Sequence, residues 1–417
     1  MKTTITSASL LALSALCLPS AQAQDNTKPW NVSASLRGFY DDNWTTLPSS
    51  SANKRSSYGF DLSPSAGYKN SFELADVDLR YTYGMKFYES RTSNQADHSH
   101  QFDGKVTHDF PERFKLTVTD SFVVSQEPGV LETSGVTTTA LRQNGNNIRN
   151  AVGVTLGVDL SRTTSIEAAY NNSVYEYDSK GVANSTSALL DRVEHLMRLD
   201  LRCKPVDTTM WLAGYQFGIT DQTGKDLLTG VGLPEVRNSR SHYGYVGVDH
   251  TFNPQLLGSA RVGVQYTEFP NASQSLVAEP GSTVTPYADF SGTYAYSPEG
   301  SVQLGIKHNR NQTDVAAGTL DAAATTVYTS VNHKFFGKLT TSLIAQYQLT
   351  EFRGGTADGL SDNIFLAGLN LSYELIKERL FAEAGYNYDR LDSDLGKIGQ
   401  NRSFYRNRVF LGLKATY

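Results

Sequence analysis

Apolar and polar residues alternate one by one through most of the chain. In the last segment, 403–417, Tyr405, Leu411, Leu413 and Tyr417 share one side, and most residues between them are charged, small or polar. A period of two is the repeat of a β-strand, whose successive side chains point to opposite faces. The segment is therefore predicted to be a strand with one apolar and one polar face.

The same alternation recurs from residue 30 onward. The further segments are 30–40, 58–68, 77–87, 102–110, 114–124, 152–160, 166–170, 193–201, 211–219, 246–252, 256–266, 290–296, 302–306, 327–335, 339–349, 365–375 and 380–388. Together they predict about eighteen strands, with sixteen as the alternative; both are even numbers within the range of bacterial membrane barrels.

The connections between these strands alternate in length. Brief ones have turn chemistry, such as Pro111–Arg113 and Ser297–Gly300. The long polar ones are 43–57, 127–147, 178–190, 220–241, 270–283, 311–324 and 390–402. This alternation predicts an antiparallel up-and-down barrel with short periplasmic turns and long extracellular loops.

Rings near the ends of the apolar faces fit the two aromatic girdles of a membrane barrel, for example Trp30 with Tyr40 and Phe365 with Tyr373. The opposite faces carry too many charges for a dry core. Only helices and closed barrels satisfy every backbone polar group in lipid. The predicted fold is all-β, a closed antiparallel transmembrane β-barrel around an aqueous lumen.

The N-terminus predicts export. Lys2, the apolar run 10–18 and the small-residue site at 21–23 are typical of a secretory signal peptide over residues 1–23. A short periplasmic segment, 24–29, and the barrel, 30–417, follow. The predicted location is the bacterial outer membrane. The net charge of −5 and the lack of a basic block argue against a nucleic-acid partner.

Charged residues on the polar faces are the candidates for lining a pore. They are Arg37, Arg80, Lys86, Asp103, Lys105, Arg198, Arg202, Arg261, Arg406 and Arg408. Because the first and last strands meet where the barrel closes, Arg37, Arg406 and Arg408 are predicted to be neighbours. They form either a basic ladder that selects solutes or ordinary ion pairs with Glu383 or nearby loop carboxylates.

Histidines offer only weak metal candidates. His98 and His100 share one face of a strand end, where a girdle position is the alternative to a weak divalent site. His108, His250 and His333 repeat the pattern V-x-H-x-F before short turns, on well-separated strands that cannot converge on one ion. We therefore expect interfacial anchors, with no metal site and no cofactor.

Two loops are candidates for narrowing the pore, and one residue departs from the pattern of the wall. Loop 127–147, by analogy with general porins, or loop 220–241, which contains several apolar residues, is predicted to narrow the channel. Asp120 falls in the lipid-facing phase, where a charge is costly. A β-bulge that shifts the phase or a subunit contact would explain it.

The first strand carries a family resemblance. Leu36–Arg37–Gly38–Phe39–Tyr40–Asp41–Asp42–Asn43 resembles the opening of a family of outer-membrane β-barrel porins of Gram-negative bacteria. That resemblance implies a channel without catalytic residues, in a family with some members associated with exopolysaccharide export. The last strand is similar to the C-terminal recognition strand of outer-membrane proteins, which implies delivery to the barrel-assembly machinery through Tyr417.

The leading expectation is a porin-like channel for passive diffusion of small hydrophilic solutes, not an enzyme. A barrel that displays loops for adhesion and an exopolysaccharide export channel are the alternatives. Outer-membrane lipid and lipopolysaccharide are the expected surroundings, and association into a homo-oligomer stays open.

Overall fold

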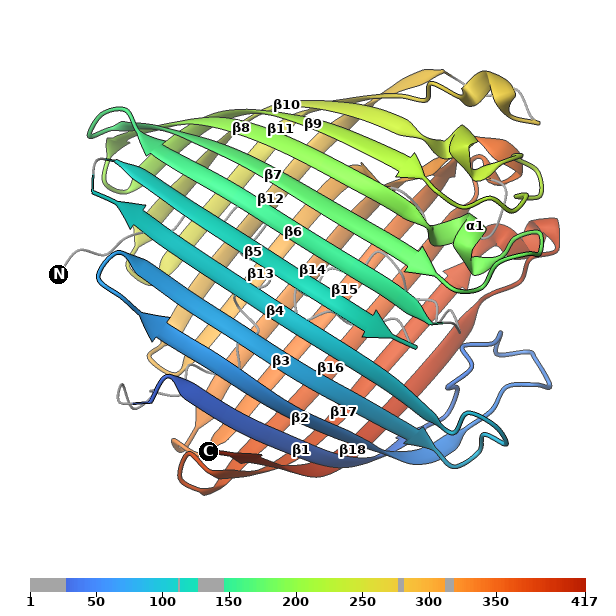
Figure 1. Ribbon diagram of the computed structural model, residues 1–417, viewed down its shortest axis with the longest axis horizontal. Coiled ribbons are helices and arrows are strands. Elements are labelled where there is room, and N and C mark those ends of the chain that lie inside the picture. Colours follow the sequence, from blue (N-terminus) through green and yellow to red (C-terminus); the bar gives the residue numbers. More distant parts are fainter. Residues whose placement is uncertain (1–27, 112, 127–145, 277–280, 312–318) are drawn as a thin grey trace.

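The computed structural model describes residues 28–111, 113–126, 146–276, 281–311 and 319–417. Within these ranges strands predominate (Figure 1). No helix in the described part of the chain has the length and apolar content needed to span a membrane.

The strands form one sheet of 18, and β1 pairs with β18 to close it (Figure 1). Their bounds are β1 (Trp30–Asp41), β2 (Ser57–Ser71), β3 (Ala75–Tyr88), β4 (Ala96–Phe110), β5 (Phe114–Ser125), β6 (Asn147–Asp159), β7 (Thr164–Tyr177), β8 (Arg192–Val206), β9 (Thr209–Gln222), β10 (Ser239–Asn253), β11 (Leu256–Glu268), β12 (Ser282–Ser297), β13 (Gly300–Asn311), β14 (Asp321–Phe335), β15 (Leu339–Arg353), β16 (Ser361–Ile376), β17 (Leu380–Ser393) and β18 (Phe404–Thr416). Each strand is antiparallel to both neighbours in the ring, so the predicted closed up-and-down barrel is confirmed. The count is eighteen, not the alternative of sixteen.

The helices that the structure describes are short and lie in the loops between strands. They are α1 (Thr186–Leu190), η1 (Pro234–Arg237), η2 (Ala272–Gln274), η3 (Gly355–Ala357) and η4 (Asp394–Ile398). They occupy the end of the barrel that carries the long loops, opposite the end with the short turns and the last residue of β18 (Figure 1).

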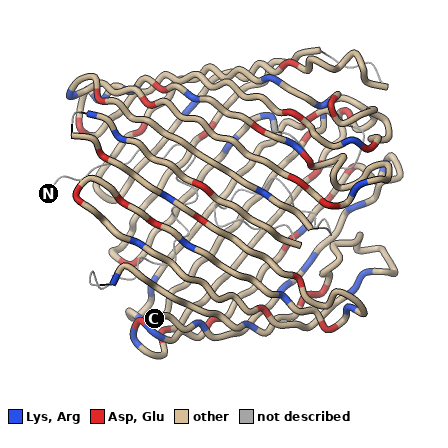
Figure 2. The backbone as a smooth tube through the Cα atoms, viewed as in Figure 1, with Lys and Arg blue, Asp and Glu red and all other residues tan. Residues whose placement is uncertain are grey.

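The apolar residues lie mainly outside. Leu36, Val246 and Leu411 expose 55%, 58% and 70% of their surface on the outer face. In a water-soluble sandwich such residues would fill the space between two sheets. A belt of exposed apolar side chains around a closed sheet instead matches the lipid-facing wall of a membrane barrel. Basic and acidic positions recur along the strands and at both ends (Figure 2).

Two prolines coincide with breaks in the ladders, because proline has no N–H to donate. The β2–β3 ladder is interrupted between Leu62 and Ser65, at Pro64. The β12–β13 ladder ends at Ala288, two residues from Pro286, although β12 continues to pair with β11 as far as Ser282. Beyond this point the β13–β14 hairpin separates from β12.

The freed end of that hairpin leans over the inner wall. Arg310 of β13 donates to Thr283 and Thr285 of β12, and its backbone N–H donates to the Gln265 side chain of β11. Thr285 and Gln265 lie on the inner face of their strands. Arg310 also binds both carboxylate oxygens of Asp321, at the start of β14. This contact turns one part of the rim toward the lumen.

Candidate functional site

The lumen is the candidate functional site, since the inner face collects the charged side chains. All ten pore-lining candidates lie on the face opposite the exposed apolar residues: Arg37, Arg80, Lys86, Asp103, Lys105, Arg198, Arg202, Arg261, Arg406 and Arg408. Their surroundings differ, and this difference divides the lumen into a packed wall and an open wall.

The packed wall begins with an ion network between β7 and β8. Arg198 Nη2 lies 2.5 Å from Glu167 Oε1, and Arg202 Nη1 lies 2.6 Å from Glu167 Oε2. Asp200 accepts a short hydrogen bond from the Tyr245 hydroxyl and lies 3.6 Å from both arginines. Because charges removed from water need partners, the network compensates the burial of these four ionised groups.

A glycine allows the tyrosine to reach this network. A Cβ atom at Gly214 would lie 2.3 Å from the Tyr245 ring and 2.4 Å from Asp200 Oδ1. Tyr245 packs in turn with Leu212 and Tyr287 on the inner face. These rings are more than nine-tenths buried, so they are part of the wall's packing.

The packed wall continues through Arg261 to the seam where the barrel closes. Its ion pairs are Arg261–Asp249 at 2.9 Å, Arg408–Asp389 at 2.7 Å, Arg406–Asp41 at 2.5 Å and Arg37–Glu383 at 2.7 Å. The last three involve the residues for which the sequence left a basic ladder or ion pairs open. The structure shows ion pairs, with Glu383 as one predicted partner and two strand carboxylates as the others.

The open wall is formed by β3 and β4. Arg80 and Lys105 are exposed on the inner face, and no ion pair joins either of them to the described residues. Asp103 accepts hydrogen bonds from Gln101 and Ser121. Lys86 stands opposite Asp61 and Asp97 in the ladders of the same face. Charges on this wall meet solvent.

The extracellular rim is also divided. Over β7–β14 the loops pack together in a cluster that we call the rim cluster: Tyr177, Ala188, Leu189, Leu190, Leu228, Val231, Val236, Phe269, Ala272 and Leu320. Arg237 is buried beside it and donates to the Leu189 carbonyl oxygen at 3.0 Å. The loop predicted to narrow the channel, 220–241, thus contributes buried Leu228 and Val231 to the cluster. Its Leu227 and Leu233 stay about half exposed. The other predicted constriction, 127–147, lies almost wholly outside the described residues.

Asp191 fixes α1 in this cluster. Its carboxylate accepts hydrogen bonds from the Ser187 hydroxyl and from the Tyr177 backbone N–H. Burial nevertheless raises the pKa of the Asp191 carboxyl above its usual range, since removal from water penalises the charged form. The two hydrogen bonds therefore hold the loop and oppose the effect of burial on this carboxylate.

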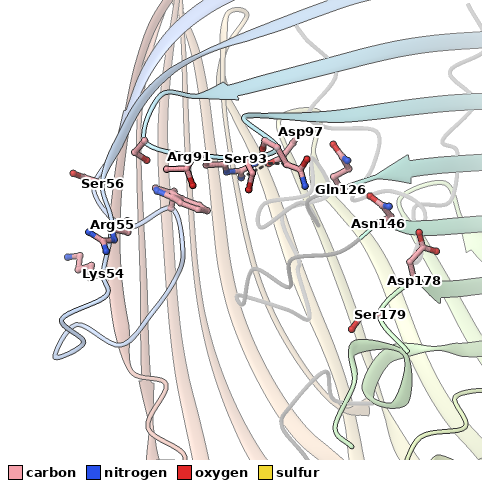
Figure 3. A pocket seen from close by; sticks show the side chains of 14 residues that line it. Lys54, Arg55, Ser56, Arg91, Ser93, Asp97, Gln126, Asn146, Asp178 and Ser179 are labelled. Atoms are coloured by element: carbon pink, nitrogen blue, oxygen red, sulfur yellow. Dashed lines mark hydrogen bonds and ion pairs between the residues drawn. The ribbon is translucent and has the colours of Figure 1, made fainter. Parts of the chain in front are cut away.

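Over β1–β7 the rim instead encloses a cavity of about 1120 Å³, which we call the mouth cavity (Figure 3). It is lined by Trp44, Lys54, Arg55, Ser56, Ser90, Arg91, Thr92, Ser93, Asn94, Asp97, Gln126, Asn146, Asp178 and Ser179. These residues come from the loops after β1 and β3, from the start of β4 and from the ends of β5, β6 and β7. The open wall lies below the same arc of strands.

The histidines lie on the other side of the wall. His98 and His100 of β4 are on the outer face, where each Nδ1 is hydrogen bonded to a tyrosine hydroxyl, Tyr83 at 2.7 Å and Tyr81 at 2.8 Å. No group of three His, Cys, Asp or Glu side chains within the described ranges is placed to hold a metal ion.

The V-x-H-x-F repeats are also on the outer face. His108, His250 and His333 each lie against the phenylalanine two residues later, with ring centres 4.3, 4.5 and 4.2 Å apart. They belong to β4, β10 and β14, so they do not converge. Each pair adds an amphipathic ring near the end that bears the short turns.

Asp120 points outward. It pairs with Gly104 and Val152 in ladders that run without interruption on both sides, so the suggested β-bulge is wrong. Its Oδ1 is buried and has no hydrogen-bond partner within the part of the chain that the structure describes.

Apart from Glu383, the sequence pattern missed the partners of the arginines. The Asp41 carboxylate accepts a hydrogen bond from the Asn43 N–H at 3.1 Å. It also binds Arg406 with both carboxylate oxygens. Asp389 and Asp200 alternate in phase with the arginines and so lie on the inner face with them. This shared face was the only sequence signal for the ion pairs. The residues of the mouth cavity gave no such signal, because loop residues show no regular alternation of apolar and polar positions.

A closed barrel of eighteen antiparallel strands, apolar outside and charged inside, defines an outer-membrane β-barrel of the porin type. The chain belongs to the family described as "Putative beta-barrel porin 2", which it matches over residues 30–417. None of the curated proteins compared with the chain matches it.

Solved structures of outer-membrane proteins are similar to the chain. OpdK from Pseudomonas aeruginosa is 10% identical, with a TM-score of 0.46, and the match covers 93% of this chain and 99% of OpdK. OccAB4 from Acinetobacter baumannii is 12% identical, with a TM-score of 0.45 and coverage of 94% and 100%. The FrpB iron transporter from Neisseria meningitidis is 10% identical, with a TM-score of 0.43 and coverage of 88% and 62%.

Proposed function

We propose that the protein is a channel through which small hydrophilic solutes diffuse passively across the outer membrane. The observation that carries the proposal is the open wall. Arg80 and Lys105 face the lumen in contact with solvent and without an ion pair among the described residues. A charge held inside a barrel without a partner needs water, and a hydrated lumen is a path for hydrophilic solutes.

The packed wall and the rim cluster set the limits of this path. Ion pairs and buried tyrosines pack on the inner face from β7 to β12, and the rim cluster lies above β7–β14. The path for solutes therefore follows the open wall of β3 and β4, beneath the mouth cavity. The pore-lining role thus belongs to Arg80, Lys86, Asp103 and Lys105. Arg37, Arg198, Arg202, Arg261, Arg406 and Arg408 stabilise the packed wall through their ion pairs.

The alternative function, polysaccharide export, lacks an observation as direct as the open wall. Aromatic rungs along the lumen would guide a sugar chain, but two of the inward rings, Tyr245 and Tyr287, are buried against each other and against Leu212. They present little surface to a passing chain.

The apolar belt and its rings meet membrane lipid, and lipopolysaccharide surrounds the extracellular half. The β18 strand with Tyr417 engages the barrel-assembly machinery during insertion. The apolar belt supports the first two partners, and the resemblance of the last strand to the recognition strand of outer-membrane proteins supports the third.

Planar-bilayer recording tests the channel. The mature protein, refolded in detergent and checked for heat-dependent migration on gels, is added to a bilayer in KCl. Stable ohmic steps are expected. A barrel that inserts but stays silent would contradict the channel and favour a protein that displays its loops.

A further inference from the structure

The mouth cavity carries opposite charges at its two ends. Lys54 and Arg55, in the loop after β1, lie at one end, and Asp178 with Ser179, just after β7, lies at the other (Figure 3). Arg55 and Asp178 are exposed, and no ion pair binds either of them to a described residue. The Lys54 ammonium lies over the Tyr405 ring, 4.1 Å from its centre.

The other two charges of the cavity neutralise each other. Arg91 binds Asp97 through both terminal nitrogens, Nη1 and Nη2, at 2.6 and 2.7 Å, and the two side chains are 8% and 13% exposed. The Arg91 guanidinium also lies 4.7 Å from the Trp44 ring centre and 4.0 Å from that of Tyr88. This stacked pair holds the wall between the two loops. Since the Lys54 ammonium lies over the outward ring of Tyr405, Arg55 and Asp178 are the charges that a solute would meet in the cavity.

Neutral hydrogen-bonding groups line the space between the charged ends. Ser90, Thr92 and Ser93 offer hydroxyls, and Asn94, Gln126 and Asn146 offer amides. Hydroxyls and amides both donate and accept, so they match the N–H and C=O groups of a peptide backbone.

We propose that the mouth cavity binds short peptides as zwitterions. The carboxylate would bind Arg55, and the ammonium would bind Asp178. A guanidinium pairs with a carboxylate through two parallel hydrogen bonds, which gives the complex an orientation. This inference rests on the proposed channel and names the class of solute that enters it.

The volume and the chemistry both favour a peptide. About 1120 Å³ exceeds the space that a single amino acid needs and reaches the upper range of small-molecule sites. A neutral sugar would leave Arg55 and Asp178 without partners. It would also find the Trp44 ring already covered on the side that faces Arg91.

Triglycine is the probe, because only its ends are charged. Added to the extracellular side of the refolded full-length channel, it is expected to cause reversible, concentration-dependent interruptions of the current. In detergent it is expected to change Trp44 fluorescence, read as the difference between the wild type and Trp44→Phe. Arg55→Gln and Asp178→Asn should each weaken both responses about tenfold or more, as expected for loss of a charged hydrogen bond.

Matched variants and probes make the test specific. Lys377→Gln and Asp207→Asn remove the same charges from turns at the far end, where both side chains are exposed, and should change nothing. Acetylated and amidated triglycine and maltotriose should bind more weakly than triglycine. Equal responses to triglycine and its capped form, stronger responses to maltotriose, or variants that bind like wild type would each overturn the inference.

The two proposals fail in different ways. A channel that conducts but responds to triglycine neither in current nor in fluorescence overturns the peptide site alone. A protein that binds triglycine by fluorescence but never conducts overturns the channel and leaves the site.

Discussion

Asp120 places a carboxylate on the lipid-facing side of β5, between Val118 and Phe122. A charged or unpaired polar group in this belt opposes folding into the membrane. We expect Asp120→Leu to raise the free energy of unfolding, by roughly 1–2 kcal/mol, since acidic residues cost less there than the 2–4 kcal/mol of basic ones. Urea titration of the barrel refolded into lipid vesicles measures this.

The inner face supplies the control for that measurement. Asp103 lies on the neighbouring strand but faces the lumen and accepts hydrogen bonds from Gln101 and Ser121. Asp103→Leu should lower the free energy of unfolding. If Asp120→Leu destabilised the barrel as well, the outward carboxylate would have a partner that stabilises it, such as a second protein in the membrane.

Alternation along the sequence predicted the face of a side chain, but not its partner. Arg406, Asp41 and Asp389 all carry the inward phase, yet their ion pairs depend on the stagger between strands. A shift of two residues keeps every side chain on its face and changes each pair. The face of the sheet on which a side chain lies thus follows from the local sequence, whereas its ion-pair partner depends on the register between strands.

The seam between β1 and β18 closes the barrel, and one ion pair at its extracellular end is almost fully buried. Arg406 and Asp41 are 1% and 2% exposed. Arg406→Ala leaves a buried carboxylate unpaired and should cost about 3–5 kcal/mol of unfolding free energy. Asp41→Leu combined with Arg406→Met should recover most of this loss.

Urea unfolding of the barrel refolded into lipid vesicles measures the unfolding free energies of Arg406→Ala and of the double variant. Arg390→Ala on β17 breaks a pair with Asp392 in which both side chains are more than half exposed. It should cost under about 1 kcal/mol. Equal losses for Arg406→Ala and Arg390→Ala would show that the seam does not depend on its buried pair.

The end of the β13–β14 hairpin is held over the lumen by Arg310. This side chain and Asp321 are 8% and 3% exposed, and Arg310 also reaches Thr283 and Thr285. Arg310→Ala should free the hairpin end and add rapid current fluctuations to single-channel recordings. Arg353→Ala on β15 removes an exposed pair with Glu351 and should leave the recordings steady. Fluctuations in neither variant would mean that the hairpin end does not reach the conducting path.

The elements themselves followed from the sequence. The period of two marks strands that face lipid on one side and water on the other, and this holds from β1 to β18. The leaning hairpin was not predicted, because 311–324 reads as a polar loop although β14 begins at Asp321. Pro286 was the one signal, since a strand that contains proline cannot donate at that position.

At the scale of the whole molecule, the lumen has two unequal halves. The packed wall pairs its charges and carries the rim cluster, whereas on the open wall Arg80 and Lys105 are exposed beneath the mouth cavity, without an ion pair among the described residues. No sequence pattern distinguishes the two, because Arg198 and Arg80 have the same inward phase. The difference comes from the contacts each wall makes across strands and with the loops.

This division predicts where charge controls conduction. Reversing the open-wall charges with Arg80→Glu and Lys105→Glu should shift the reversal potential in a KCl gradient toward cation selectivity, because unpaired charges in a narrow hydrated path select ions of opposite sign. Lys377→Glu on an outer turn, where the side chain is 87% exposed, should not shift it. Arg198→Glu reverses a charge inside the packed wall, so it should reduce the yield of folded barrel. A normal yield of Arg198→Glu barrels with shifted selectivity would place the conducting path along the packed wall.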